Sequence, residues 1–292
     1  MNFNDLLQGK NINPEHVIAL RHRPYETQLN KVIPWLATTR PDLFNAYQQA
    51  QGVKLEKVMQ TLEKTGYIAS FIGRGAGKAL FVGLYAIKSS TPITYDEYWK
   101  ITANIELKRF GMVGFQGERK SILWFDLALI DFYNYWKGKL IVNWPPPERS
   151  WWRRVHRNNL LIHAIHEHSI LEADMPEWDT INFSWEELRV LPTHWKSILS
   201  QWRGIYYIFD TSNGKGYVGS AYGKENILGR WLNYSVSGHG GNRLLRKCNP
   251  QNFQFTILQR VSPDISTSDI IQIENTWKER LHTREPYGLN NN

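Results

Sequence analysis

The strongest constraint on the fold is a pair of short apolar runs that are joined by a turn sequence. Residues 204–209 read GIYYIF, residues 210–216 read DTSNGKG, and residues 217–220 read YVGS. Aromatic and β-branched residues favour extended strands, whereas Asp, Ser, Asn and Gly favour tight turns. The sequence therefore predicts an antiparallel β-hairpin in which the two runs lie side by side.

Further elements are expected to complete a small domain after this hairpin. In chain order, they are a helix over 225–236, a shorter helix over 242–247, a strand over 253–258 and a helix over 266–281. Alternating aromatic residues support the strand. Ser266 and Asp269 have the spacing of a capping box, which supports the start of the last helix.

Several polar side chains on these elements are placed to meet at one end of the sheet. Tyr206 and Tyr217 lie on the two hairpin strands, while Arg230 and Tyr234 are neighbours on one helix face. Glu274 lies on the apolar stripe of the last helix, where a carboxylate is costly unless it is paired or holds a metal. Such a set suits phosphodiester cleavage. Aromatic core packing and a structural salt bridge are the alternatives that spacing leaves open.

Gly204-Ile205-Tyr206, followed by Tyr217-Val218-Gly219, resembles the paired signature of the GIY-YIG nuclease superfamily, with valine in place of the second isoleucine. Arg230 and Glu274 follow on later helices, in the order of the family's arginine and glutamate. The resemblance covers about residues 202–292. It implies a compact α/β domain with a three-stranded antiparallel sheet flanked by helices.

The resemblance also implies a reaction and roles for the site residues. It implies hydrolysis of nucleic-acid phosphodiesters with Mg²⁺ or a similar ion such as Mn²⁺. By resemblance, Tyr206 is the general base, Tyr217 hydrogen-bonds in the site, and Tyr234 matches a position held by Tyr or His. Arg230 stabilises the transition state and Glu274 holds the metal. Since a phenol has a pKa of about 10, the base role needs a nearby guanidinium and a metal-bound water.

Weaker candidates lie around this set. His239 is in the loop GHGGN, where it is either a proton-transfer or DNA-contact residue or an ordinary surface histidine. Asn290 matches an asparagine that some relatives place near the active site. Contacts to the DNA backbone, or a solvated helix face, are expected of three basic residues: Arg243, Arg246 and Lys247.

The first 199 residues match no family signature, and we expect them to form a mixed α+β domain. Residues 1–65 are predicted to be helical, residues 67–87 to form a hairpin, residues 139–144 a strand and residues 151–171 a helix. A tryptophan-bearing connector over 176–192 leads to a boundary near 193–201. The overall class expected is therefore α/β (α+β), with domains over 1–199 and 200–292.

Two motifs in this N-terminal region resemble known functional signatures but lack residues that those signatures require. GRGAGK at 73–78 lacks the first glycine and the final Ser or Thr of a phosphate-binding loop. HAIHEH at 163–168 lacks the i, i+4 histidine spacing of a metalloprotease. We expect a flexible turn and ordinary helical histidines instead.

Charge and composition favour a polyanionic partner. The chain has 35 Lys and Arg against 27 Asp and Glu, and net charge +8. Residues 200–292 hold half of that excess in less than half the length, as expected of a DNA-binding surface. No apolar stretch suits a membrane span, and the first residues lack a secretory pattern. Because Cys248 is the single cysteine, we expect a reducing, cytoplasmic location without membrane association.

Together these features predict a metal-dependent DNA endonuclease of restriction or defence type. We expect residues 1–199 to read DNA and residues 200–292 to cut it. Candidate reader contacts are the hairpin-tip residues Arg74 and Lys78 and the cluster Arg149, Arg153, Arg154 and Arg157. The alternatives are a repair or recombination nuclease acting on branched or damaged DNA, and an inactive DNA-binding protein. The oligomeric state stays open, a dimer included.

Overall fold

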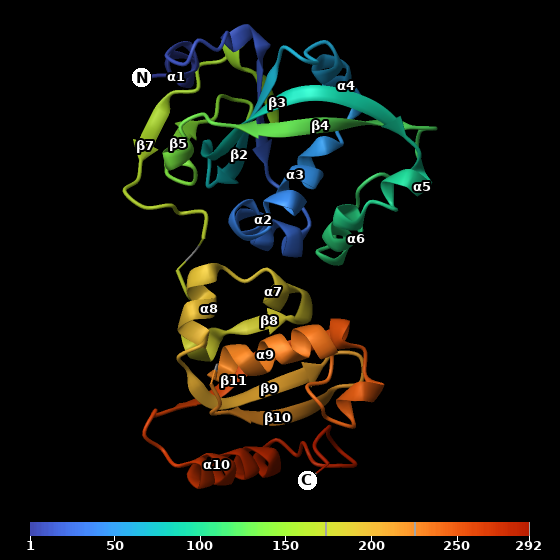
Figure 1. The fold of residues 1–292 in the computed structure, drawn as a ribbon, viewed down its shortest axis with the longest axis vertical. Helices are drawn as coiled ribbons and strands as arrows, with labels where there is room; N and C mark the ends of the chain where they lie inside the picture. Colours follow the sequence, from blue (N-terminus) through green and yellow to red (C-terminus); the bar gives the residue numbers. More distant parts are fainter. Residues whose placement is uncertain (173, 225, 292) are drawn as a thin grey trace. The chain divides into compact units, whose positions relative to one another are not determined.

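The protein is an α+β chain with two sheets. The computed structural model describes residues 1–172, 174–224 and 226–291. The chain divides into two compact units, Met1–Ala173 and Asp174–Asn292 (Figure 1). Among the described residues, none of the helices has the length and apolar character that a membrane crossing needs.

The first unit contains a seven-stranded sheet of order β6-β1-β2-β3-β5-β7, with β4 paired to β3. Its strands are β1 (Val17–His22), β2 (Tyr67–Arg74), β3 (Lys78–Ile93), β4 (Ile122–Ile130), β5 (Leu140–Asn143), β6 (Trp152–Arg154) and β7 (Ile162–Ile165). Its helices are α1 (Phe3–Gln8), α2 (Thr27–Thr39), α3 (Pro41–Gln49), α4 (Val53–Gln60), α5 (Tyr95–Tyr98) and α6 (Thr102–Arg109), with 3₁₀ turns η1 (Pro14–His16), η2 (Asn134–Trp136) and η3 (Val155–Arg157).

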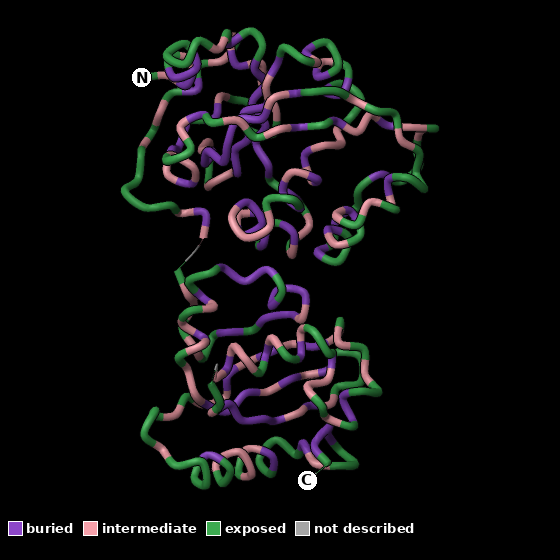
Figure 2. The backbone as a smooth tube through the Cα atoms, in the orientation of Figure 1, coloured by how far each residue is buried: buried purple, intermediate pink, exposed green. Residues whose placement is uncertain are grey.

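The core of this unit lies on its central strands, which are buried along most of their length (Figure 2). Phe3 of α1 contacts the rings of Phe71 on β2 and Phe81 on β3. These aromatic contacts fix the N-terminal helix to the sheet.

The residue pattern of the sequence correctly predicted some of the strands in this unit. The hairpin over 67–87 is confirmed by β2 and β3, and the strand over 139–144 by β5. The expectation of helix throughout 1–65 is wrong at β1, whose six residues are all buried. A fully buried strand has no polar alternation, so its short apolar run reads like a buried helix.

The helix predicted over 151–171 is also wrong. Trp152–Arg154 forms β6 and pairs with β1, while Ile162–Ile165 forms β7 and pairs with β5. Both strands are short and owe their conformation to pairing with partners distant in sequence, which local periodicity does not report.

The second unit has a four-stranded antiparallel sheet of order β10-β9-β11-β8. Its strands are β8 (Asn182–Ser184), β9 (Arg203–Asp210), β10 (Lys215–Ala221) and β11 (Phe253–Val261). Its helices are α7 (Trp185–Arg189), α8 (Thr193–Leu199), α9 (Asn226–Ser237) and α10 (Thr267–Arg280), with 3₁₀ turns η4 (Trp178–Thr180), η5 (Leu245–Lys247) and η6 (Pro250–Asn252).

The predicted hairpin, the strand at 253–258 and the last helix are confirmed, the last with Ser266 as its N-cap. Glu225, the first residue of the predicted helix over 225–236, lies outside the described residues. The helix expected over 242–247 is reduced to the short turn η5.

The expected three-stranded sheet is wrong by one strand, because the connector supplies β8. Phe183 of β8 stacks on Trp195 of α8 and meets Trp231 of α9 edge-on, with ring centroids 5.7 and 6.2 Å away. The connector thus belongs to the second unit, and the two units divide before residue 174, earlier than the predicted boundary near 193–201.

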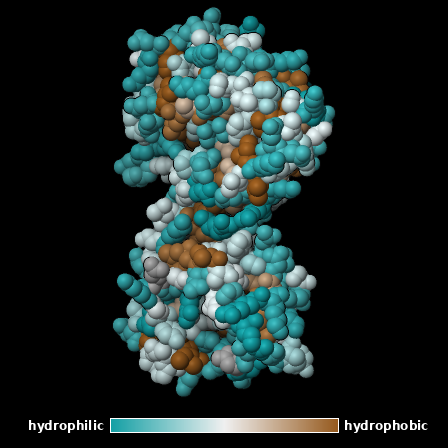
Figure 3. Space-filling view, turned by 45° about the vertical axis from the view of Figure 1, so that its right-hand side comes forward, coloured by the Kyte–Doolittle hydropathy of each residue, from teal (hydrophilic) through white to brown (hydrophobic). Residues whose placement is uncertain are grey.

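Helices α9 and α10 cover opposite faces of this sheet. Successive strand residues point to opposite faces. Tyr206 contacts Tyr234 of α9, whereas its neighbour Ile205 packs with Ile270 of α10. In the view of Figure 3, hydrophilic residues cover most of the surface of each unit, with smaller hydrophobic patches among them.

Candidate active site

Three tyrosines meet on the α9 face of the second unit's sheet. Tyr206 comes from β9, Tyr217 from β10 and Tyr234 from α9, with ring centroids 6.1 to 6.4 Å apart. The hydroxyls of Tyr206 and Tyr234 share a hydrogen bond of 3.1 Å. Tyr206 and Tyr234 are buried and Tyr217 is partly exposed. The structure therefore brings together the three tyrosines that the sequence singles out.

Both glycines of the two triplets lie where a side chain has no room. Gly219 pairs with Tyr206 across the hairpin, and a Cβ at Gly219 would lie 2.5 Å from the Tyr206 Cζ. A Cβ at Gly204 would meet the backbone of Arg260 at 3.2 Å, beside the register shift of β11. Gly219 thus lets the Tyr206 ring cross β10 toward Tyr234.

Burial raises the pKa of all three phenols above the ordinary value for tyrosine. For Tyr206, the charge of Arg230 and the hydrogen bond from Tyr234 lower the pKa, but loss of solvation outweighs them. The cluster is therefore neutral at pH 7, which opposes the predicted role of Tyr206 as a phenolate base.

Glu274 lies on α10 and is already paired. Its Oε1 forms a salt bridge of 2.7 Å with Lys278 Nζ, and its Oε2 accepts a hydrogen bond from the hydroxyl of Ser220. Only 16% of the Glu274 side chain and 3% of the Lys278 side chain are exposed. The salt bridge that the sequence leaves open as an alternative is thus present.

Ser220 and Lys278 are residues that sequence reasoning did not select. Lys278 follows Glu274 by four residues, so the i, i+4 spacing of opposite charges was an available signal. Ser220 directly follows the second triplet, and no sequence signal linked it to Glu274, because that contact joins a strand to a distant helix.

The tyrosines and Glu274 approach the edge of the sheet from opposite faces. Ser220 pairs with Ile205, and both point to the α10 face, whereas Gly219 and Tyr206 belong to the α9 face. β10 is the end strand of the sheet, so side chains from both faces of the sheet can reach its edge. Glu274 is close enough to raise the pKa of Tyr206 and Tyr217 by its charge.

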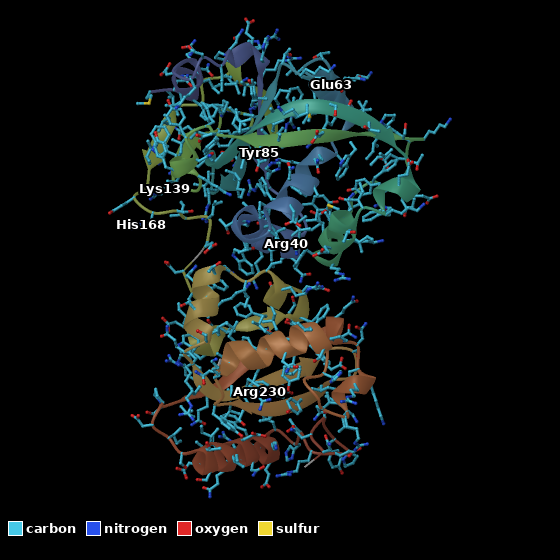
Figure 4. The ribbon with its side chains drawn as sticks, in the orientation of Figure 1. Arg40, Glu63, Tyr85, Lys139, His168 and Arg230 are labelled. Atoms are coloured by element: carbon cyan, nitrogen blue, oxygen red, sulfur yellow. The ribbon has the colours of Figure 1, made fainter. Side chains whose placement is uncertain are left out.

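Arg230 is exposed on α9 (Figure 4). Its charge lowers the pKa of Tyr206 and Tyr217, which places the guanidinium within electrostatic range of both phenols. It forms no hydrogen bond or ion pair within residues 1–172, 174–224 and 226–291. An exposed guanidinium within electrostatic range of the cluster is available to an anionic ligand.

Asn290 is buried, and both the oxygen and the nitrogen of its amide are hydrogen-bonded to Val218. Its Oδ1 accepts from the Val218 amide at 2.9 Å, and its Nδ2 donates to the Val218 carbonyl at 2.8 Å. The Leu289 amide donates to the carbonyl of Gly216. Asn290 therefore closes part of the β10 edge, and its predicted contact with nucleic acid stays a prediction.

The remaining candidate contacts of the second unit differ in exposure and in hydrogen-bonding partners. His239 is partly exposed and its Nδ1 accepts from the Gly241 amide. Arg243 forms a 3.0 Å salt bridge with Glu285, while Arg246 and Lys247 are exposed. These residues lie in or just after the 238–242 loop.

Two of the candidate reader residues, Arg74 and Lys78, lie on β2 and β3. Arg74 donates from Nη2 to the carbonyl of Ile170, and burial lowers its pKa. Lys78 begins β3 and is partly exposed. Arg74 is therefore partly used in holding the chain at Ile170, and only Lys78 keeps the character expected of a DNA contact.

Among the described residues, no group of three or more His, Cys, Asp or Glu side chains converges as a metal site. Glu274 provides a carboxylate near the tyrosines. Mg²⁺ is commonly held by one or two carboxylates, with water and substrate phosphate filling the remaining positions. A single carboxylate of this kind fits such an ion, although Lys278 competes for one of its oxygens.

Comparisons with known proteins give a partial likeness. No protein-family model and no curated protein sequence matches the chain. The catalytic domain of homing endonuclease I-TevI is 29% identical over 31% of this chain and 98% of that chain, with a TM-score of 0.26. A mutant form of the catalytic domain of intron endonuclease I-TevI is 29% identical over 31% of this chain and 93% of that chain, with a TM-score of 0.25.

The close approach at Gly219 yields a structural prediction. We expect Gly219→Ala to lower the free energy of unfolding by about 1–3 kcal/mol, because the added methyl group displaces the Tyr206 ring. Gly223→Ala is the matched control, since a Cβ there meets nothing within 4 Å. Chemical denaturation followed by tyrosine and tryptophan emission gives both values. Equal stability of the two variants would contradict this packing.

Proposed function

We propose that the unit Asp174–Asn292 hydrolyses phosphodiester bonds in DNA. The observation that carries the proposal is Arg230, an exposed guanidinium without a described hydrogen-bond or ion-pair partner, placed beside a buried hydroxyl pair and within reach of the same phenols as Glu274. A cation, paired hydroxyls and one carboxylate are the groups that phosphoryl chemistry uses for positioning and charge stabilisation.

In this proposal Arg230 binds the scissile phosphate. Two guanidinium N–H groups can donate to two phosphate oxygens at once, a geometry that a lysine does not reproduce. The charge on those oxygens grows in the transition state, so the same contact is stronger there than in the ground state. Arg230 thus serves both to orient the phosphate and to lower the barrier.

Tyr206 orients the attacking water in its neutral form. Burial holds its proton, while the hydrogen bond with Tyr234 fixes the direction of the hydroxyl. A fixed hydroxyl can hold water in line with the phosphate without being deprotonated. Proton removal by Tyr206, as the family resemblance implies, requires that bound DNA or metal first lowers the pKa of the phenol.

Glu274 is the residue that would hold a divalent cation, Mg²⁺ or Mn²⁺. A bound cation of this kind neutralises charge on phosphate and leaving oxygen. Ser220 and Lys278 fix the carboxylate in place.

We further propose a restriction or defence role in which the first unit selects the DNA. The support is that Met1–Ala173 forms a compact unit with its own core, separate from the unit that holds the candidate chemistry. A repair or recombination nuclease would instead prefer branched DNA. Cleavage of plain, modified and branched duplexes by the full chain in Mg²⁺ separates these roles.

The carboxylate has a direct test. We expect Glu274→Gln to abolish Mg²⁺-dependent cleavage while DNA binding persists, because it removes the anionic ligand at nearly constant volume. Glu279→Gln, an exposed change on the same helix, is the control and should cut normally. Since the single variant leaves Lys278 buried without its partner, Glu274→Gln combined with Lys278→Met checks that loss of cleavage is not loss of folding. Undiminished cleavage by folded Glu274→Gln protein would show that Glu274 is not the metal ligand.

The hydroxyl pair has its own test. Tyr206→Phe should lower the cleavage rate by at least about 10²-fold, because it removes the group that orients water. Tyr207→Phe, the neighbouring change on the opposite face of β9, should leave the rate unchanged. Single-turnover rates and melting temperatures are measured for both. If Tyr206→Phe only melts earlier and still cuts, Tyr206 is a packing residue.

A further inference from the structure

The first unit contains a pocket of about 540 Å³ that the proposed cleavage site does not use. It is lined by the chain at and after the end of β1, the junction of α3 and α4, the segment 112–122 and Trp151. Volumes of about 300–1,000 Å³ are typical of pockets for small organic groups. The pocket is therefore large enough for a single nucleotide but not for a duplex.

Neutral polar groups lie in the buried part of this pocket. His22, 5% exposed, lines it and shares a 3.3 Å hydrogen bond between its Nε2 and Gln48 Oε1. Burial lowers the pKa of His22 to about 4, so the imidazole is uncharged at pH 7. Because Gln48 Oε1 only accepts, Nε2 donates to it, and Nδ1 is the acceptor nitrogen left for a ligand. Tyr47 lines the same wall and burial raises its pKa, so its phenol is also neutral.

Aromatic rings surround these groups. Tyr98 and Phe115 are buried lining residues whose rings meet edge-on. At the mouth, the side chains of Tyr25 and Trp151 are 80% and 41% exposed. Exposed aromatic faces beside a pocket with a neutral polar wall suit a flat, polar ring system.

The charged groups that line the pocket are engaged within the protein, apart from Arg23. Arg21 is buried, and its guanidinium donates to the carbonyls of Glu148 and Gly75. Arg23 lines the pocket, is exposed, and forms no hydrogen bond or ion pair with the described part of the chain. Glu26 accepts a hydrogen bond from the Val113 amide, and Glu118 accepts one from the Gln116 amide, so both carboxylates hold the 112–122 segment. Arg119 is paired with Glu56.

We propose that this pocket receives one nucleobase turned out of duplex DNA. The aromatic rings would stack on the base, His22 and Tyr47 would hydrogen-bond its polar edge, and Arg23 would hold an adjoining phosphate. A free anion would need an unpaired cation in the buried part of the pocket, and an apolar ligand would leave the polar His22 against hydrocarbon. The proposal rests on the assignment of DNA as the substrate, and it names how that substrate is read.

The test is DNA binding by the full chain in EDTA, which prevents metal-dependent cleavage. The probes are one matched duplex and four versions that carry a single mismatch, each presenting a different base. Turning out a mismatched base costs less than turning out a paired one. We expect at least one mismatched duplex to bind about tenfold more tightly than the matched duplex, a difference of about 1.4 kcal/mol.

The variant Tyr25→Ala with Trp151→Ala should remove that preference, since both aromatic side chains at the mouth are lost. Tyr135→Ala, another exposed aromatic change in the first unit but outside the pocket, is the control and should retain it.

Three results would overturn the proposal: no mismatch preference, a preference that survives the double variant, or displacement by free deoxynucleosides without any preference among duplexes. The last result would assign the pocket to a free nucleoside. Cleavage in Mg²⁺ is scored separately. Pocket-dependent binding without cleavage supports the reader and removes the nuclease proposal, whereas cleavage without pocket-dependent binding does the reverse.

Discussion

The register of β9 against β10 is the constraint on which the candidate site depends. It sets Gly219 opposite Tyr206, so that the Tyr206 ring can cross the neighbouring strand and share its hydroxyl with Tyr234. The next residue, Ser220, then points to the other face and bonds Glu274. A shift of one residue would exchange these faces and separate every one of these contacts. Asn290 holds the outer edge of β10 and so supports that register.

The electrostatics of the site favour the binding of an anion and disfavour a deprotonated tyrosine that could act as a base. Burial keeps the three phenols protonated, and Lys278 occupies one oxygen of Glu274. Arg230 is the charged group beside the cluster that forms no hydrogen bond or ion pair with a described residue. A bound phosphate would provide a negative partner for the Arg230 guanidinium. The neutral hydroxyls would then lie next to the group that reacts.

Sequence predicted those parts of the fold that local chemistry determines. The hairpin at 204–220 carries its own turn signal, and Ser266 marks the start of α10, so both were found. β8 and β6 were missed, because three-residue strands exist only through pairing with distant partners. Tyr206 and Tyr217 were selected through the two triplets, and Tyr234 through its i, i+4 spacing from Arg230. Ser220 was not, since its contact with Glu274 links residues far apart in sequence, and the burial of Asn290 depends on the folded β10 edge.

The central claim is that Arg230 and its neighbours form a site for phosphodiester hydrolysis. The most direct measurement is the rate of strand breakage by the full chain in Mg²⁺, with wild-type and Arg230→Ala proteins compared on supercoiled plasmid and on modified and branched DNA. The account predicts breakage by wild type that stops in EDTA, and a rate at least about 10²-fold lower for Arg230→Ala. Equal rates for the two folded proteins, or no breakage of any of these DNAs by wild type, would contradict it.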